Sequence, residues 1–261
     1  MPDGSGGVSL TSEPFLSVVI PAFNEESRLA ASLDRIEGYM ELLGKSFEVI
    51  VVDDGSTDQT AEIGRRLSAR PLKGQRIRLF CNGENRGKGF SVRRGMLAAR
   101  GEFALMTDAD LSTPIEEFEN LEKRLQDEGL DLVFGSRDLE DSDVQVRQPW
   151  IRETLGKLFN RLVRLVTALP YRDTQCGFKL FRMKSCRPLF ECQSVEGFIF
   201  DVEILFVARK WSLKMAEVPV TWRHAEGSKV SVVATAPSTI IDLFRIHLNN
   251  ARSRYSRAER S

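Results

Sequence analysis

The stretch F-A-L-M-T-D-A-D-L-S-T-P, residues 103–114, places two carboxylates directly after a short apolar run. The run F-A-L-M predicts a buried strand, and side chains two residues apart lie on the same side of a strand. Asp108 and Asp110 can therefore point toward one ion. Mg²⁺ and Mn²⁺ prefer such oxygen ligands and complete their coordination shells with water and substrate phosphates. The alternative is a solvated turn in which Ser112 or Thr113 caps the following helix.

The composition of the 261-residue chain fits one large α/β domain, or a core domain with an added lobe. Lys plus Arg equal Asp plus Glu at 37 each, so no overall charge points to nucleic acid. The four cysteines have neither C-x-x-C spacing nor the density of a disulfide scaffold, which indicates free thiols in a reducing compartment. No apolar run reaches the roughly 18 residues of a membrane-spanning helix, so we expect any membrane contact to be peripheral.

Short apolar runs alternate with amphipathic helices in the first half of the chain. The predicted strands are Leu16–Ile20, Phe47–Val52, Ile77–Phe80, Phe103–Met106 and Leu130–Phe134. An apolar stripe from Leu29 to Leu43 predicts a helix with Ser27 as its N-cap. Further helices are expected to begin near residues 56–58 and at Thr113, where Glu116 would complete a capping box. This alternation predicts a mostly parallel sheet covered by helices on both faces.

Three polar clusters follow directly on these predicted strands. They are P-A-F-N-E at 21–25, D-D-G-S-T-D at 53–58 and D-A-D at 108–110. Each has a structural explanation as a strand end, a turn or a helix cap. In parallel sheets, however, ligands bind at the carboxyl ends of the strands, so all three clusters should face one crevice. Three clusters on one edge favour a binding site over three unrelated turns.

The segment N-R-G-K-G at 85–89 forms a basic, glycine-containing turn before a predicted helix. Glycine lets backbone N–H groups approach a phosphate, and a helix N-terminus favours negative charge. The spacing is not that of a P-loop, and no G-x-G-x-x-G follows the first strand. The sequence therefore indicates a phosphate-bearing ligand and argues against a dinucleotide-binding domain.

Taken in order, V-V-I-P-A-F-N-E-E, V-V-D-D-G-S-T-D, N-R-G-K-G, D-A-D-L-S-T-P and G-S-R resemble the family 2 inverting glycosyltransferases. In the second half, R-D-T-Q-C-G-F-K-L-F at 172–181, F-D-V-E at 200–203 and E-G-S-K at 226–229 resemble the dolichyl-phosphate β-glucosyltransferase branch. The dolichyl-phosphate mannosyltransferases match less well from Arg172 onward. The resemblance covers about residues 16–250. It implies a GT-A fold, with a mostly parallel, Rossmann-like α/β sheet flanked by helices and with C-terminal amphipathic helices.

The resemblance also implies a sugar-nucleotide donor, UDP-glucose, and a bound Mg²⁺ or Mn²⁺. Asp108 and Asp110 would carry the metal on the diphosphate of the donor. Ser112 stands where some mannosyltransferase relatives have Gln, which leaves a third protein ligand in doubt, and water could take its place. The residues implied to bind the nucleotide sugar are Pro21, Ala22, Asn24, Glu25, Asp53, Asp54, Gly55, Arg86, Lys88, Gly89, Asp108, Ala109 and Gln175.

The implied acceptor is a dolichyl or other polyprenyl phosphate, which is already ionised near neutral pH. Transfer to such an acceptor needs fixed cations more than a strongly perturbed general base, and guanidinium groups engage phosphate oxygens through two parallel bonds. The catalytic candidates are Asp201, Arg137, Arg152, Arg223 and Lys229. Asp201 would be the base for a hydroxyl acceptor, and would orient the sugar or an arginine for a phosphate. His224 is a second candidate base, although a lone His beside Trp222 is more often structural.

A lipid acceptor also requires a surface that meets the bilayer. The segment Ile151–Val166 combines an apolar stripe with basic residues, which fits an interfacial helix or an ordinary packed helix with a basic face. Apolar residues from 240 to 246 precede a basic C-terminus and repeat this pattern. We therefore expect a cytoplasmic protein bound peripherally to the inner face of a membrane, with a membrane-anchored partner protein as a further candidate.

The expected organisation is a disordered leader at 1–14, a nucleotide-sugar-binding half at 15–137, an acceptor-binding half at 138–250 and a basic tail at 251–261. Four alternatives stay open. The donor could be GDP-mannose, or the acceptor a glycan hydroxyl. A nucleotidyltransferase should carry a glycine-rich loop after the first strand, where P-A-F-N-E stands instead. A non-catalytic sugar-nucleotide binder would not need the paired carboxylates and the basic residues.

Overall fold

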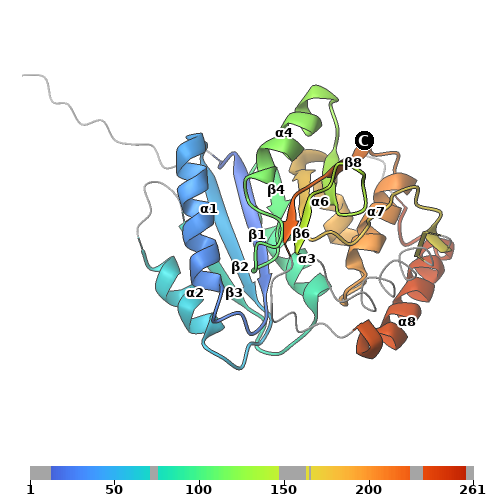
Figure 1. Ribbon diagram of the computed structural model, residues 1–261. Helices are drawn as coiled ribbons and strands as arrows, with labels where there is room; N and C mark the ends of the chain where they lie inside the picture. Colours follow the sequence, from blue (N-terminus) through green and yellow to red (C-terminus); the bar gives the residue numbers. More distant parts are fainter. Residues whose placement is uncertain (1–12, 71–75, 147–162, 165, 224–231, 257–261) are drawn as a thin grey trace, which may run out of the picture.

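The computed structural model describes residues 13–70, 76–146, 163–164, 166–223 and 232–256. The strands are β1 (Leu16–Ala22), β2 (Phe47–Asp53), β3 (Arg76–Cys81), β4 (Phe103–Met106), β5 (Leu132–Ser136), β6 (Val144–Val146), β7 (Lys179–Arg182), β8 (Met215–Pro219) and β9 (Trp222–Arg223). Seven of them form one sheet in the order β3-β2-β1-β4-β7-β5-β8 (Figure 1). In this sheet β7 runs antiparallel to β4 and β5, and the other pairs are parallel. A separate pair joins β6 to β9.

Helices cover both faces of the large sheet. They are α1 (Leu29–Leu43), α2 (Thr60–Ser68), α3 (Lys88–Ala98), α4 (Glu117–Asp127), α6 (Met183–Cys192), α7 (Phe200–Lys210) and α8 (Val232–Ala251). One core cluster joins the sheet to α1 and α4, and the other joins it to α3, α6, α7 and α8. In Figure 1, α1 and α8 lie at opposite ends of the molecule.

The strand residues alternate between the two core clusters, as the pleat of a strand requires. Within β1, Val18 and Ile20 belong to the cluster with α1, whereas Val19 belongs to the cluster with α3. Within β2, Val51 and Val52 divide in the same way. Both faces of these strands are thus buried, which explains their continuous apolar sequences. The predicted mostly parallel α/β sheet with helices on both faces is confirmed.

All three helices begin later than predicted, and before two of them a side chain holds the loop. Ser27 is not the N-cap of α1, which begins at Leu29 after Arg28. The helix predicted near residues 56–58 begins later, at Thr60, whose backbone N–H donates to the Asp58 carboxylate at 2.9 Å. The helix predicted from Thr113 begins at Glu117, without the capping box. In that loop Asp110 accepts a bond from the Ser112 backbone at 2.9 Å and forms a tight turn.

Strand β7 joins the second half of the chain to the first. Its register pairs Lys179 with Met106 of β4, and also with Phe134 of β5. The sheet therefore continues across the boundary expected near residue 137. The predicted helix Ile151–Val166 lies outside the described residues except at its end, where Val163 is buried in the core.

A buried carboxylate ties the C-terminal segment to the centre of the molecule. Glu203 of α7 is fully buried and accepts bonds from the Val195 backbone at 2.7 Å and from the Tyr255 hydroxyl at 2.5 Å. It also accepts two bonds from the backbone of Ser194 at 3.0 Å. Asn249 of α8 donates to the Ser194 hydroxyl at 2.8 Å. Helix α8 is thus fixed to the loop that precedes α7.

We expect Gly95→Ala to destabilise the fold, because α3 packs on the sheet at this glycine. A Cβ at Gly95 would lie 2.4 Å from the Val19 side chain. Overpacking of this kind costs about 1–3 kcal/mol, and the better helix propensity of Ala offsets only roughly 0.5–1 kcal/mol. The matched control is Gly38→Ala in α1, where a Cβ meets nothing within 4 Å. Chemical denaturation should show a loss of stability for the first variant and a gain for the second; equal effects would contradict this packing.

Candidate functional site

A cavity of about 390 Å³ lies at the carboxyl ends of β1, β2 and β4. At β1 the strand order reverses, with β2 and β3 on one side and β4 on the other, and such a switch point is where α/β sheets bind ligands. Eight of the sequence-predicted site residues line this cavity. They are Pro21, Ala22, Glu25, Asp54, Lys88, Asp108, Ala109 and Asp110.

The two predicted metal ligands lie on a tight turn that follows β4. The Leu111 backbone N–H donates to the Asp108 carbonyl at 3.1 Å, and Leu111 has a φ of 47°. Ser32 of α1 donates its hydroxyl to the Ala109 carbonyl at 2.6 Å, which anchors the turn to that helix. The turn brings both Asp108 and Asp110 to the cavity wall.

Gly177 lies directly behind Asp108. A Cβ built at Gly177 would come within 2.1 Å of Asp108 Oδ2 and within 3.0 Å of Asp108 Oδ1. Any other residue at this position would therefore push the carboxylate away. The glycine comes from the R-D-T-Q-C-G-F-K-L-F segment, so the second half of the chain positions a metal-ligand candidate of the first half.

Positively charged side chains lie against both carboxylates. Lys88 Nζ lies 2.6 Å from Asp108 Oδ1, and Arg28 Nη1 lies 3.8 Å from Asp110 Oδ2. Burial alone would lower the pKa of Lys88, but Asp108 and Asp201 outweigh that effect and raise its pKa. Lys88 is therefore an ammonium ion at neutral pH, and the cluster favours positive charge.

The donor set fits a hard divalent cation. Within the described part of the chain, no group of three or more His, Cys, Asp or Glu residues could hold a metal ion by itself. Two carboxylates are nevertheless enough for Mg²⁺ or Mn²⁺, because these ions commonly take their remaining ligands from water and substrate phosphates. Asp108 and Asp110 would be the protein ligands. The ammonium group of Lys88 beside Asp108 marks a position where the electrostatic potential of these carboxylates favours a cation.

Asp54 organises the basic turn before α3. Its carboxylate accepts bonds from the backbone of Gly87 at 2.8 Å and of Arg86 at 3.1 Å, and from the Asn82 amide at 2.7 Å. A Cβ at Gly87, which has a φ of 103°, would lie 2.4 Å from the Glu196 carbonyl oxygen. The turn is thereby held so that α3 begins at the cavity wall, where a helix N-terminus favours an anion.

Five of the predicted nucleotide-sugar residues support the cavity without lining it. Asn24 accepts a bond from the Thr57 backbone at 2.8 Å, which joins the loops after β1 and β2. Asp53 is 3% exposed, and its Oδ1 has no hydrogen-bond partner among the described residues. The others are Gly55, Arg86 and Gly89. Gly55 has a φ of 71°, and a Cβ there would lie 2.4 Å from the Glu84 backbone.

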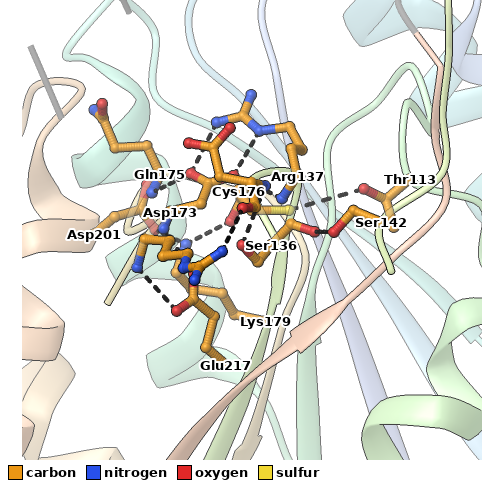
Figure 2. A network of polar contacts seen from close by, with 12 residues as sticks. Thr113, Ser136, Arg137, Ser142, Asp173, Gln175, Cys176, Lys179, Asp201 and Glu217 are labelled. Carbon is orange, nitrogen blue, oxygen red and sulfur yellow. Dashed lines mark hydrogen bonds and ion pairs between the residues drawn. The ribbon is translucent and has the colours of Figure 1, made fainter. Parts of the chain in front are cut away.

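Arg137 directly follows β5, and the buried carboxylate of Asp173 holds its side chain (Figure 2). Its guanidinium contacts Asp173 through Nε at 2.7 Å and through Nη2 at 2.9 Å. Burial alone would raise the pKa of Asp173, but the guanidinium outweighs it and holds this pKa below its usual value. The pair therefore adds stability at neutral pH that is lost as the pH falls through the lowered pKa of Asp173. Gln175 donates its backbone N–H to the same carboxylate at 3.1 Å and does not line the cavity.

Asp201 forms a buried ion pair with Lys179 (Figure 2). The two side chains are 4% and 1% exposed, and Lys179 Nζ lies 2.8 Å from Asp201 Oδ1. Burial raises the pKa of Asp201, while Lys179 and Lys88 oppose the rise. The candidate base therefore lies behind the cavity wall and is already paired with a cation.

The remaining predicted cations are placed as follows. Arg223 is exposed at the end of β9, and its backbone N–H donates to the Ser112 carbonyl at 2.8 Å, close to the turn that carries Asp110. Arg152, Lys229 and the candidate base His224 lie outside the described residues.

The cavity is also lined by residues that were not predicted individually as site residues, although three of them lie in the P-A-F-N-E and N-R-G-K-G segments. They are Phe23, Arg28, Asn85, Gly87, Ser91 and Phe198. Phe23 and Arg28 lie in or just after the P-A-F-N-E cluster, so their nearness in sequence was a usable signal. Phe198 comes from the loop before α7, and only the folded structure brings it to the cavity.

Comparison with known proteins assigns the chain to a family. The family model for glycosyl transferase family 2 matches residues 17–190. The dolichyl-phosphate beta-glucosyltransferase of Dictyostelium discoideum is 37% identical over 242 residues, which cover 89% of this chain and 73% of that protein. The human dolichyl-phosphate beta-glucosyltransferase is 37% identical over 225 residues, which cover 82% of this chain and 69% of that protein.

A solved structure agrees with this assignment at the level of the fold. It is the glucosyl-3-phosphoglycerate synthase of Mycobacterium tuberculosis in complex with Mn²⁺ and UDP-glucose. The TM-score is 0.61 at 21% identity, and the match covers 88% of this chain and 78% of that one. This likeness shows the GT-A fold, as the sequence predicted. The chain belongs to glycosyl transferase family 2.

Proposed function

We propose that this glycosyltransferase moves glucose from UDP-glucose to a dolichyl-type polyprenyl phosphate, with inversion at the anomeric carbon. The observation that carries the proposal is the pair of carboxylates, Asp108 and Asp110, at a cavity on the carboxyl edge of the sheet. Two relatives that are 37% identical to this chain over most of its length are dolichyl-phosphate beta-glucosyltransferases. The resemblance of the segments from Arg172 onward to the glucosyltransferase branch favours glucose over mannose.

The donor would lie along the cavity from the end of β1 to the start of α3. Its nucleoside would contact the wall formed by Pro21, Ala22 and Asp54. Asp53, next to Asp54 in the chain, does not line the cavity, and its unpartnered carboxylate oxygen is buried. The diphosphate would lie near the N-terminus of α3 and Lys88, with Asp108 and Asp110 holding Mg²⁺ or Mn²⁺. That ion, when bound, neutralises the charge that the leaving diphosphate develops.

The acceptor phosphate would need cations, because it brings a second anion close to the diphosphate. Arg137 and Arg223 are the described candidates, and Arg152 and Lys229 lie outside the described residues. The Arg137 side chain is 31% exposed, and its contacts with Asp173 hold the guanidinium in one orientation. An ionised phosphate attacks without losing a proton, so the buried pairing of Asp201 with Lys179 fits a residue that orients its neighbours.

Helix α8 offers a surface for the membrane that carries such an acceptor. Its described half exposes four apolar side chains, while Leu243 and Ile246 face the core. The exposed set is Ile240, Ile241, Phe244 and Leu248. Arg252 just after the helix is an exposed cation, and the half-exposed Arg245 on the helix pairs with Asp242 at 3.2 Å. Such a helix lies in the interface of an anionic membrane.

We place the protein peripherally on the cytoplasmic face of that membrane. The four cysteines are free, which fits a reducing compartment. Within the described residues, no helix combines the length and the hydropathy that a bilayer crossing requires.

We expect a transfer assay to give lipid-extractable label from UDP-glucose, in the presence of a short polyprenyl phosphate and Mg²⁺ or Mn²⁺. Asp110→Ala should lower this rate at least about 100-fold, since losing even an outer-shell partner costs 10–100-fold in metal affinity. Label from GDP-mannose alone would reassign the donor. Metal-dependent UDP binding without lipid-soluble label from either donor would reject the lipid acceptor and favour a glycan hydroxyl.

Gly177→Ala should weaken metal-dependent UDP binding about tenfold with little loss of thermal stability, because the new Cβ displaces only the Asp108 carboxylate. Titration calorimetry with UDP and Mn²⁺ measures the first effect, and thermal melting measures the second. Gly38→Ala again serves as the control, since its Cβ meets nothing. Normal UDP binding by the Gly177 variant would show that metal-dependent UDP binding does not depend on the position of the Asp108 carboxylate.

Phe244→Asp should lower binding to anionic phospholipid vesicles about tenfold or more, since burying a Phe side chain contributes roughly 1.5–3 kcal/mol. The side chain is 73% exposed, so the melting temperature should change little. Leu42→Asp is the control, because Leu42 is 88% exposed on α1 at the other end of the molecule (Figure 1). Vesicle sedimentation measures the affinities. If both variants lost the same vesicle affinity, or if neither lost any, α8 would be rejected as the membrane surface.

A further inference from the structure

Each candidate metal ligand already lies next to a cationic side chain, but the two contacts differ. Lys88 Nζ lies 2.6 Å from Asp108 Oδ1, which is the distance of a direct, charge-assisted hydrogen bond. Arg28 Nη1 lies 3.8 Å from Asp110 Oδ2, and Arg28 binds Glu25 more closely, at 2.6 Å. Lys88 is therefore the cation that a metal ion must replace.

A metal ion and Lys88 compete for the same carboxylate, that of Asp108. Its Oδ2 faces Gly177, so closely that a Cβ there would lie 2.1 Å away, whereas its Oδ1 faces Lys88. Lys88 already contacts Oδ1. A divalent ion would bind this oxygen at about 2.0–2.1 Å, within a few ångströms of the ammonium group. Like charges at that separation repel strongly, so the metal and Lys88 must exchange places.

The displaced ammonium group needs a new anionic partner. Asp201 also acts on Lys88, but it is already paired with the buried Lys179 at 2.8 Å. Lys88 is the first residue of α3, and a helix N-terminus is where a phosphate group is favoured. The diphosphate of the donor is therefore the partner best placed to receive this side chain.

We propose that Lys88 is a positioning residue that holds Asp108 in the free enzyme and moves to the donor diphosphate when the metal ion binds. This inference rests on the proposed function, since it takes a nucleoside diphosphate and a divalent ion as the ligands. When the ion binds alone, Lys88 loses Asp108 and gains no new anionic partner. When the ion binds together with the diphosphate, Lys88 exchanges Asp108 for the diphosphate. The two ligands therefore bind cooperatively, and each tightens the other by the same factor.

The test measures Mn²⁺ binding directly, by the electron paramagnetic resonance signal of the free ion, with and without saturating UDP. UDP is used because it permits no turnover. The ratio of the two affinities is the coupling factor. The proteins are the wild type and the variants K88M, K88Q and K88R, with K184M as the control because Lys184 is exposed on α6. Thermal melting confirms that each variant folds.

We expect K88M and K88Q to bind Mn²⁺ alone about tenfold more tightly than the wild type, with the coupling factor about tenfold lower, within the usual range of coupling between sites. K88R keeps the charge and should retain most of the coupling, and K184M should behave as the wild type. If Lys88 had only a structural role, its variants would bind both Mn²⁺ and UDP more weakly and the coupling factor would be unchanged.

Two results overturn the inference: an unchanged coupling factor in K88M and K88Q, or weaker binding of Mn²⁺ alone by both variants. The inference rests only on the donor side of the proposed function, a site for a nucleoside diphosphate with a divalent ion. Failure of that part is distinguishable, because the wild type itself would then show no coupling between Mn²⁺ and UDP, whereas a wrong acceptor would leave the coupling intact.

Discussion

The antiparallel pairing of β7 with both β4 and β5 is the constraint on which the site depends. The pairing of Lys179 with Met106 fixes the start of β7 beside the end of β4, just before the turn that carries Asp108. Gly177 then meets the Asp108 carboxylate, and Lys179 reaches Asp201 on α7. A register shift of one residue would turn the side chains of β7 to the opposite face of the sheet. The donor cavity in the first half of the chain thus takes its geometry from the second half.

Charge balance around the cavity is arranged pair by pair. The buried pairs Lys179–Asp201 and Arg137–Asp173 each compensate a carboxylate that would be costly to bury alone. Removing one member of such a pair leaves an uncompensated charge, which is far more damaging than replacing both with apolar residues. At the cavity wall, by contrast, the carboxylate itself is open to solvent, because the Asp108 side chain is 35% exposed whereas those of Asp173 and Asp201 are 1% and 4% exposed. Solvent access to Asp108 makes its pair with Lys88 exchangeable, so the two pairs with buried carboxylates form the fixed frame and the wall pair can respond to ligands.

Most strands and helices could be predicted from the sequence, because continuous apolar runs mark buried strands and apolar residues at helical spacing mark the buried faces of helices. The first residues of these helices could not be predicted. Asp58 and Asp110 accept hydrogen bonds from nearby backbone N–H groups, which form turns where the sequence predicted the first helical turn. The carboxylate turn was predictable from its spacing alone. Phe198 was not, because its contact with the cavity depends on the loop before α7. The burial of Lys179 was equally hidden, since a lysine between apolar neighbours is usually found on an exposed strand face.

The topology of β7 also orders events during synthesis. The chain leaves the ribosome from its N-terminus, so β1 to β4 can pair while β7 is still untranslated. Until β7 arrives, β4 carries an open row of backbone N–H and C=O groups on one edge, which is a template for pairing with other chains. The later pairing spans a long sequence separation, which slows folding. Nascent chains of this protein therefore pass through a stage at which a chaperone covering the β4 edge would protect them from aggregation.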